Sequence, residues 1–203
     1  SDFMPVITES KSKIAALEEA KNKLHTEKIL YTIEENSGGL FKNTTYKVKA
    51  ISYQELLEEI KNYLQTILEK LDIDVSFEIL EGEDAQSYEI VMSSSNNSLL
   101  IGKDGKNLKA FEQMVRAYIS KDWPSTLKVN VNVENYREKR IESLEKLAVK
   151  VAREVRTTKV DAELENMNSF ERRVIHNKLI NFKGVSTVSV GEEPNRHIVI
   201  KAE

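Results

Sequence analysis

The chain has 203 residues, of which 40% are hydrophobic and 31% charged, a balance typical of a globular protein rather than a disordered or fibrous one. It contains no cysteine, which excludes disulfides and thiolate metal sites, and no apolar run long enough to span a bilayer. The formal net charge of −3 argues against a uniformly basic nucleic-acid-binding protein. We therefore expect a cytoplasmic protein of two or three small domains, without direct membrane insertion.

Charge is unevenly distributed along the chain. Residues 52–92 hold 11 acidic and two basic side chains, whereas residues 101–140 hold nine basic and five acidic ones. Such a separation can leave one surface attractive to phosphate although the molecule as a whole is acidic.

The first segment, residues 5–51, has the pattern of a small β-α-β-β module. A short strand at 5–8 precedes an amphipathic helix marked by Ile14, Leu17, Ala20 and Leu24. Strands follow at 29–33 and 45–51, separated by the turn Ser37-Gly38-Gly39. Leu40 and Phe41 adjoin this turn, and we expect them to plug the small core; a contact surface is the alternative.

The second segment begins with the capping sequence Ser52-Tyr53-Gln54-Glu55, which opens a helix to about Lys70. Strands are predicted at 75–80 and 88–92, and we interpret the acidic turn 81–84 between them as a solvated hairpin tip rather than a metal site. A short helix at 98–101, a glycine loop, a helix to Lys121 and a strand at 126–133 complete the segment.

The glycine loop has the composition of a phosphate-binding turn. Two glycines let the backbone turn tightly and approach a ligand, and the following helix points its first N–H groups at the loop. Asp104 lies inside the loop, where its charge should weaken but not abolish phosphate binding. A helix–turn–helix joint without a ligand is the alternative. The candidate residues are Gly102, Lys103, Asp104, Gly105 and Lys106, followed on the polar side of the helix by Lys109 and Arg116.

The third segment begins near Asn135 with a helix whose apolar side carries Ile141, Leu144, Leu147, Val151 and Val155. A strand is predicted near 157–160, and Asn168 with Glu171 forms a second capping sequence. Arg172 and His176 lie one turn apart on the helix that follows. Strands at 185–190 and 198–201 flank a turn that presents Arg196. We expect Arg172, Arg173, His176 and Arg196 to form a second phosphate site.

Two of these segments resemble known domains. Gly102-Lys103-Asp104-Gly105, in the order helix-strand-strand-helix-loop-helix-strand, resembles a type II KH domain. The stretch Asn168–His176 with Gly191–Arg196 resembles the R-three-H domain, named for an Arg and a His that match Arg172 and His176. The whole chain resembles the bacterial Jag (SpoIIIJ-associated) family, also called KhpB or EloR. The resemblance implies an α+β fold of three small modules, at residues 1–51, 52–134 and 135–203.

The resemblance also implies a function, that of a non-catalytic regulator which binds single-stranded RNA without a cofactor or metal. Its implied protein partners are a small KH-only protein and a second copy of the chain. Single-stranded DNA as the ligand and a protein-interaction adaptor at the cell-elongation or membrane-insertase machinery are the alternatives. An enzyme is not expected, because His25, His176 and His197 are not at metal-ligand spacing and no nucleophile motif accompanies them.

Overall fold

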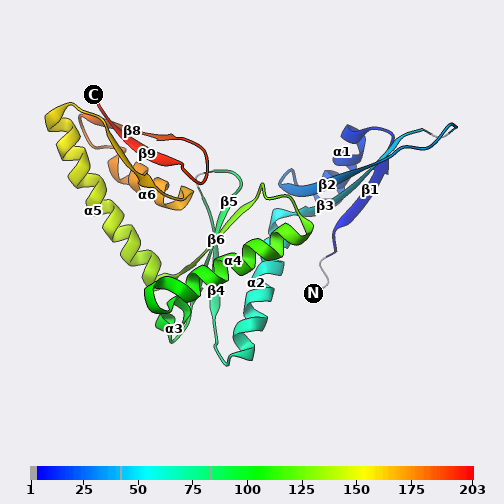
Figure 1. Ribbon diagram of the computed structural model, residues 1–203, viewed down its shortest axis with the longest axis horizontal. Coiled ribbons are helices and arrows are strands. Elements are labelled where there is room, and N and C mark those ends of the chain that lie inside the picture. The colour runs from blue at the N-terminus through cyan, green and yellow to red at the C-terminus, as the bar shows by residue number, and fades with distance from the viewer. Residues whose placement is uncertain (1–3, 42, 83) are drawn as a thin grey trace. The chain divides into compact units, whose positions relative to one another are not determined.

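The computed structural model describes residues 4–41, 43–82 and 84–203. Three separate three-stranded sheets, with strand orders β1-β3-β2, β4-β5-β6 and β7-β9-β8, alternate with helices along the chain (Figure 1). This arrangement confirms the predicted α+β class. The described residues form two compact units, one made of the chain up to Phe77 with Lys109–Val129, the other of Glu78–Leu108 with Asn130–Glu203.

The opening module has the predicted β-α-β-β order. Its helix α1 packs on one face of the sheet, where Ala16 and Ala20 meet Ile29, Val48 and Ala50. The Thr8 hydroxyl donates a hydrogen bond of 2.7 Å to the Ala16 carbonyl, which satisfies a polar group inside this small core. Its elements are β1 (Val6–Ser10), α1 (Lys13–Leu24), β2 (Ile29–Asn36) and β3 (Thr45–Ser52).

The expectation that Leu40 and Phe41 plug the core is wrong. Their side chains are 96% and 100% exposed. Only the first two residues of β2, Ile29 and Leu30, are buried, and the strand then continues as an exposed ribbon to Asn36. The turn therefore lies beyond the apolar side chains that α1 covers, and no core is within reach of its apolar residues.

The middle elements follow the predicted order. The Ser52 hydroxyl caps α2 by accepting a hydrogen bond of 3.1 Å from the Glu55 amide, and the apolar side of α2 buries Leu56, Ile60 and Leu64. The ring of Tyr63 on α2 stacks on Tyr118 of α4, with centroids 4.7 Å apart. The elements are α2 (Tyr53–Lys70), β4 (Ser76–Glu81), β5 (Ser87–Ser93), α3 (Asn97–Ile101), η1 (Lys103–Gly105), α4 (Lys106–Asp122) and β6 (Lys128–Val133).

The last elements differ from prediction in one strand, which forms at Ala162–Asn166 rather than near 157–160. No strand forms at 157–160, because α5 continues to Thr158 and ends where Lys159 takes a left-handed conformation with φ 59°. The Thr158 hydroxyl bonds the Glu154 carbonyl, so a residue that favours strands stays within the last helical turn. The elements are α5 (Glu134–Thr158), β7 (Ala162–Asn166), α6 (Ser169–Leu179), β8 (Val185–Val190) and β9 (His197–Ala202).

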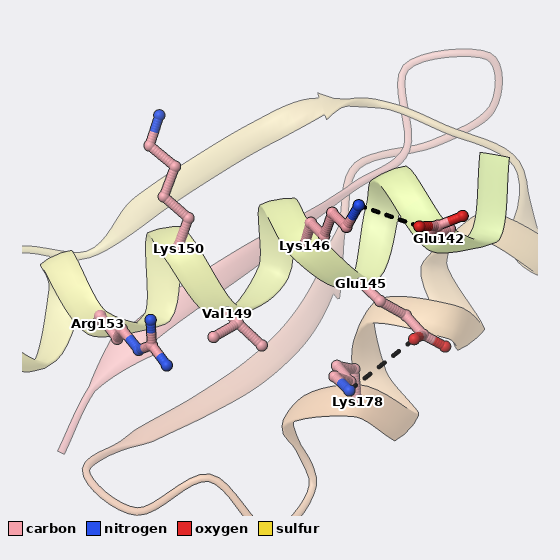
Figure 2. Close-up of a pocket in the computed structure, with 7 residues that line it drawn as sticks. All are labelled: Glu142, Glu145, Lys146, Val149, Lys150, Arg153 and Lys178. Carbon is pink, nitrogen blue, oxygen red and sulfur yellow. Dashed lines mark hydrogen bonds and ion pairs between the residues drawn. The ribbon is translucent and has the colours of Figure 1, made fainter. Parts of the chain in front are cut away.

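Helices α5 and α6 pack together with the third sheet. Their shared core includes Leu144, Ala148, Ile175 and Ile198. Two ion pairs bridge the helices outside this core, Arg140–Glu171 at 2.8 Å and Lys178–Glu145 at 3.9 Å, the second of which is drawn in Figure 2. Asn168 and Glu171 form the predicted capping box at the start of α6. Within the described residues, no helix is both long and apolar enough to cross a membrane.

We predict that replacing Leu40 and Phe41 together by serine changes the free energy of unfolding by no more than about 0.5 kcal/mol, because both side chains are already in water. Leu30→Ala, at a position only 2% exposed, should cost about 2–5 kcal/mol. Urea denaturation of the three proteins measures both effects. A large loss in the double variant would show that the two residues pack against the fold.

Candidate nucleic-acid interface

The glycine loop has a backbone that requires its glycines. Gly102 and Gly105 have φ angles of 72° and 73°, in the left-handed region that side chains disfavour, and Asp104 between them has φ 55°. A Cβ added at Gly102 would lie 2.6 Å from Cγ of Asn107. The Asn107 side chain is itself fixed, because its amide donates a hydrogen bond of 2.8 Å to the Leu99 carbonyl. The loop is therefore held in one shape by both of its ends.

Charged side chains of this loop lie on the surface. Lys103, Asp104 and Lys106 are exposed, and Lys106 is the first residue of α4. The same helix carries Lys109 and Arg116, which are also exposed. Helical periodicity puts both residues on the same side of α4 as Lys106. Gly105 is buried, and a Cβ there would lie 3.6 Å from the Tyr136 hydroxyl. The loop thus presents two lysines and one aspartate to solvent at a helix N-terminus.

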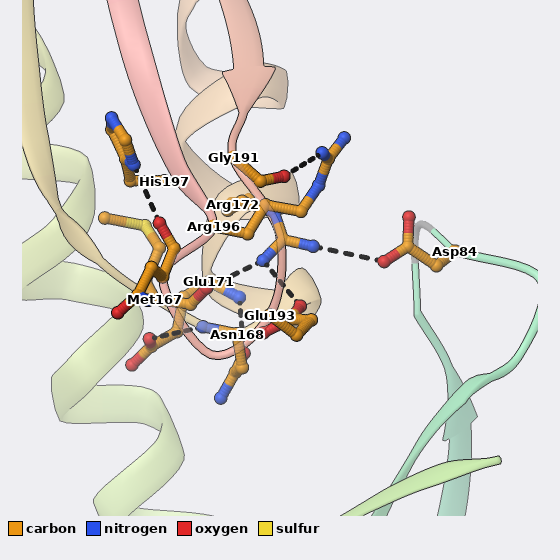
Figure 3. A network of polar contacts seen from close by, with 10 residues as sticks. Asp84, Met167, Asn168, Glu171, Arg172, Gly191, Glu193, Arg196 and His197 are labelled. Atoms are coloured by element: carbon orange, nitrogen blue, oxygen red, sulfur yellow. Dashed lines mark hydrogen bonds and ion pairs between the residues drawn. The ribbon is translucent and has the colours of Figure 1, made fainter. Parts of the chain in front are cut away.

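Arg172 differs from the other charged candidate residues because its side chain is completely buried. Its Nη1 donates to the Met167 carbonyl at 2.7 Å and to a Glu193 carboxylate oxygen at 3.2 Å. Its Nη2 donates to Asp84 at 3.1 Å, as Figure 3 shows. Nε has no partner among the described residues. The guanidinium therefore joins the β4–β5 turn, the residue before the α6 cap and the β8–β9 loop.

This environment does not suit a phosphate. Two carboxylates already neutralise the single charge of Arg172, so the cluster carries a net charge of −1. A phosphate would have to displace one of them and would meet the repulsion of the other. The acidic turn, which we interpreted as a solvated tip, instead supplies Asp84 to this cluster; Glu83 of the same turn lies outside the described residues.

The remaining members of the predicted second site have different environments. Arg173 is exposed and donates a hydrogen bond of 3.3 Å to the Glu81 carbonyl. The His176 Nδ1 lies 2.6 Å from the Thr187 hydroxyl on β8, and Arg196 is half-buried and donates to the Gly191 carbonyl at 2.8 Å. The contacts place Arg196 in the loop that Glu193 ties to Arg172, whereas His176 faces β8.

Comparison with known proteins identifies the family. Residues 57–133 match the family described as KhpA/KhpB, KH domain, and residues 142–202 match the R-three-H domain. A protein from Clostridium symbiosum named RNA-binding protein KhpB is 32% identical over 178 residues, which cover 86% of this chain and 80% of that protein. The chain belongs to the KhpB family. A Bacillus subtilis (strain 168) protein of the same name is 37% identical over 172 residues, covering 82% and 81% of the two chains.

Membership of the KhpB family confirms the resemblance to Jag proteins and the presence of KH and R-three-H domains. The module boundaries 1–51, 52–134 and 135–203 stay predictions, as does the assignment of ligand contacts to individual side chains. Among the residues that the structure describes, no group of three or more His, Asp or Glu side chains is placed to hold a metal ion.

Sequence reasoning missed a second buried ionic contact. Glu89 lies in the middle of the otherwise apolar strand β5, is 2% exposed and accepts a hydrogen bond of 3.0 Å from Nε of Arg137 on α5. A carboxylate in an apolar strand was the available signal, since a buried charge requires a partner. Burial raises the pKa of Glu89, and the nearby Arg137 only partly offsets that effect.

We predict that Arg172→Met lowers the free energy of unfolding by about 1–3 kcal/mol, because it leaves the buried Met167 carbonyl and two carboxylates without their donor. Arg173→Met, one residue away but exposed, should change it by no more than about 0.5 kcal/mol. Urea denaturation compares the two variants. Equal small effects would contradict a structural role for Arg172.

Glu89 should make stability depend on pH. Its pKa is raised in the folded chain, so the folded state holds this proton more tightly than the unfolded state, and stability falls as pH rises from 4.5 through the folded-state pKa. Measured by urea unfolding, the wild type should therefore lose stability relative to Glu89→Gln between pH 4.5 and pH 7. A difference that is constant with pH, or that grows in favour of the wild type, would contradict this account.

Proposed function

We propose that this KhpB-family chain is a non-catalytic, cytoplasmic regulator that binds single-stranded RNA. The observation that carries the proposal is the constrained loop Gly102–Gly105, which exposes Lys103 and Lys106 at the start of a helix. A backbone that approaches closely, two cations and a helix N-terminus are the elements with which proteins bind phosphate. Relatives of the chain are named RNA-binding proteins, which supports RNA as the phosphate-bearing ligand.

The first proposed contact is made by the KH loop. Gly102 and Gly105 allow the RNA backbone to come close, while Lys103 and Lys106 pair with its phosphates. Asp104 opposes this charge at a single exposed position, and Lys109 and Arg116 add two further cations along α4. The affinity of this contact alone is expected to be modest and to depend on salt.

The second proposed contact is made by the R-three-H domain through Arg173, His176 and Arg196. Arg172 acts in this proposal as a positioning residue, because it holds the loop that carries Arg196 and the N-terminal turn of α6 from beneath the surface. The Gly102–Gly105 loop, Lys106 and the R-three-H contact lie in the unit formed by Glu78–Leu108 and Asn130–Glu203, whereas Lys109 and Arg116 belong to the other unit. One strand that reaches both would be bound more tightly than either contact allows alone.

A second candidate function is that of a protein-interaction adaptor, with a small KH-only protein or a second copy of the chain as the partner. The full exposure of Leu40 and Phe41 favours an adaptor role for the opening module, since exposed apolar side chains side by side suit a protein contact. This role does not compete with RNA binding for the same residues.

We predict that the double variant Lys103→Glu/Lys106→Glu binds a fluorescein-labelled oligouridylate at least about tenfold more weakly than the wild type. The dependence of affinity on salt should also become shallower by about one unit of logarithmic slope, because two phosphate contacts are lost. Fluorescence anisotropy over a series of salt concentrations measures both quantities.

The matched control is Lys11→Glu/Lys70→Glu, which makes the same change of net charge from −3 to −7 at two exposed lysines away from the loop. An oligodeoxyuridylate of the same length tests RNA against DNA. Equal affinity losses in the two double variants would contradict a specific RNA contact at the loop. If the chain is an adaptor that does not bind RNA, neither double variant should change its interaction with a protein partner.

A further inference from the structure

A groove of about 530 Å³ lies between α5 and α6 (Figure 2), and none of the residues that line it is assigned above to RNA contact. Its basic side chains are Lys146, Lys150 and Arg153 on α5 and Lys178 on α6. Val149 provides an apolar surface between them, and Glu142 and Glu145 are the acidic members. The groove therefore carries an excess of two positive charges on a chain whose net charge is −3.

The two carboxylates engage only part of this positive charge. Glu142 pairs with Lys146 at 3.0 Å, and Glu145 reaches Lys178 at 3.9 Å, a loose contact. Lys150 and Arg153 are exposed and have no acidic partner within the described part of the chain. In Figure 2 both side chains extend from α5 without any drawn contact. These two cations are the charges available to an anionic ligand.

The groove is on a different side of α6 from His176. Lys178 follows His176 by two residues, about 200° around a helix, and His176 is directed to Thr187 on β8. Arg153 is the last residue of α5 that lines the groove, and the next arginine on the helix, Arg156, stacks over the ring of Phe182. The groove is thus separate from the R-three-H contact proposed above.

The arrangement of the cations favours a chain of phosphates over one compact anion. Lys146, Lys150 and Arg153 are four and three residues apart, so they form a row along α5 that rises about 6 Å and then about 4.5 Å. A row of cations beside an open groove is the arrangement that follows a nucleic-acid backbone, whereas a single phosphate is usually enclosed by several donors.

We propose that this groove is a further binding site for the phosphodiester backbone of single-stranded RNA. The proposal rests on the RNA-binding function proposed above and extends it to the opposite side of α6. Lys150 and Arg153 pair with successive phosphates, Val149 contacts the sugar edge, and Glu142 and Glu145 hold the ammonium groups of Lys146 and Lys178 at the groove walls. An acidic protein segment is the other ligand that such charges would accept.

The test uses Lys150→Glu/Arg153→Glu in the full chain, with the labelled oligouridylate and the anisotropy assay. We expect about tenfold weaker binding and a salt slope shallower by about one unit, beyond any effect of the control Lys11→Glu/Lys70→Glu. The conservative variant Lys150→Arg/Arg153→Lys should retain binding within about twofold, because it keeps both phosphate-neutralising charges.

A second measurement needs no variant. Chemical acetylation of the wild-type lysines, followed by mass spectrometry, should be slowed at Lys150 by the oligouridylate and unchanged at Lys11. The groove site is overturned if the oligouridylate does not protect Lys150, or if the groove variant binds the oligouridylate as tightly as the control variant does. If the groove variant then fails to bind an acidic peptide that the wild type binds, the groove is assigned to a protein ligand.

Different results would contradict the groove site and the proposed RNA-binding function. If the oligouridylate binds the wild type and Lys103→Glu/Lys106→Glu weakens it but the groove variant does not, only the groove inference fails. If the wild type does not retain the oligouridylate even in dilute buffer, the proposed RNA-binding function fails, and the groove as an RNA site fails with it.

Discussion

The guanidinium of Arg172 is fully buried, and acceptors from three separate segments close around it. Asp84 comes from the β4–β5 turn, Met167 from the residue before the α6 cap, and Glu193 from the β8–β9 loop. Burying a guanidinium costs several kcal/mol unless its charge and its donors are matched. The cost is offset here only when all three segments are in place, so Arg172 makes their positions depend on one another.

This dependence explains how the R-three-H surface is organised. Arg173 and Arg196 are held by hydrogen bonds to backbone carbonyls of Glu81 and Gly191, in the same two segments that supply Asp84 and Glu193. The arginine that gives the domain its name is thus buried, whereas the neighbouring Arg173 is exposed and Arg196 is half-buried. The internal charge of Arg172 is neutralised by carboxylates, so only the more exposed cations are left for the RNA contacts proposed above.

The sequence predicted most elements correctly because their signals are local. Helix periodicity, the Ser52 and Asn168 caps and the two glycines around Asp104 depend on neighbours within a few residues, and each forms as expected. Two environments could not be predicted from the sequence, and the physical cause is the same. The spacing of Arg172 and His176 shows that they share a helix side but not what covers it, and Asp84 lies 88 residues from its partner. Leu40 and Phe41 are apolar, yet the hydrophobic pattern of the strands does not show where α1 stops covering the sheet, so their exposure could not be predicted.

The most direct test of this account is an NMR titration that follows isotope-labelled arginine side chains while a short oligouridylate is added. The account predicts that the guanidinium signals of Arg153 and Arg173, both exposed, shift with RNA, whereas the Arg172 signal stays in place because its donors remain on Met167, Asp84 and Glu193. An Arg172 signal that moves as far as those of the exposed arginines would contradict it, since RNA would then be displacing the carboxylates.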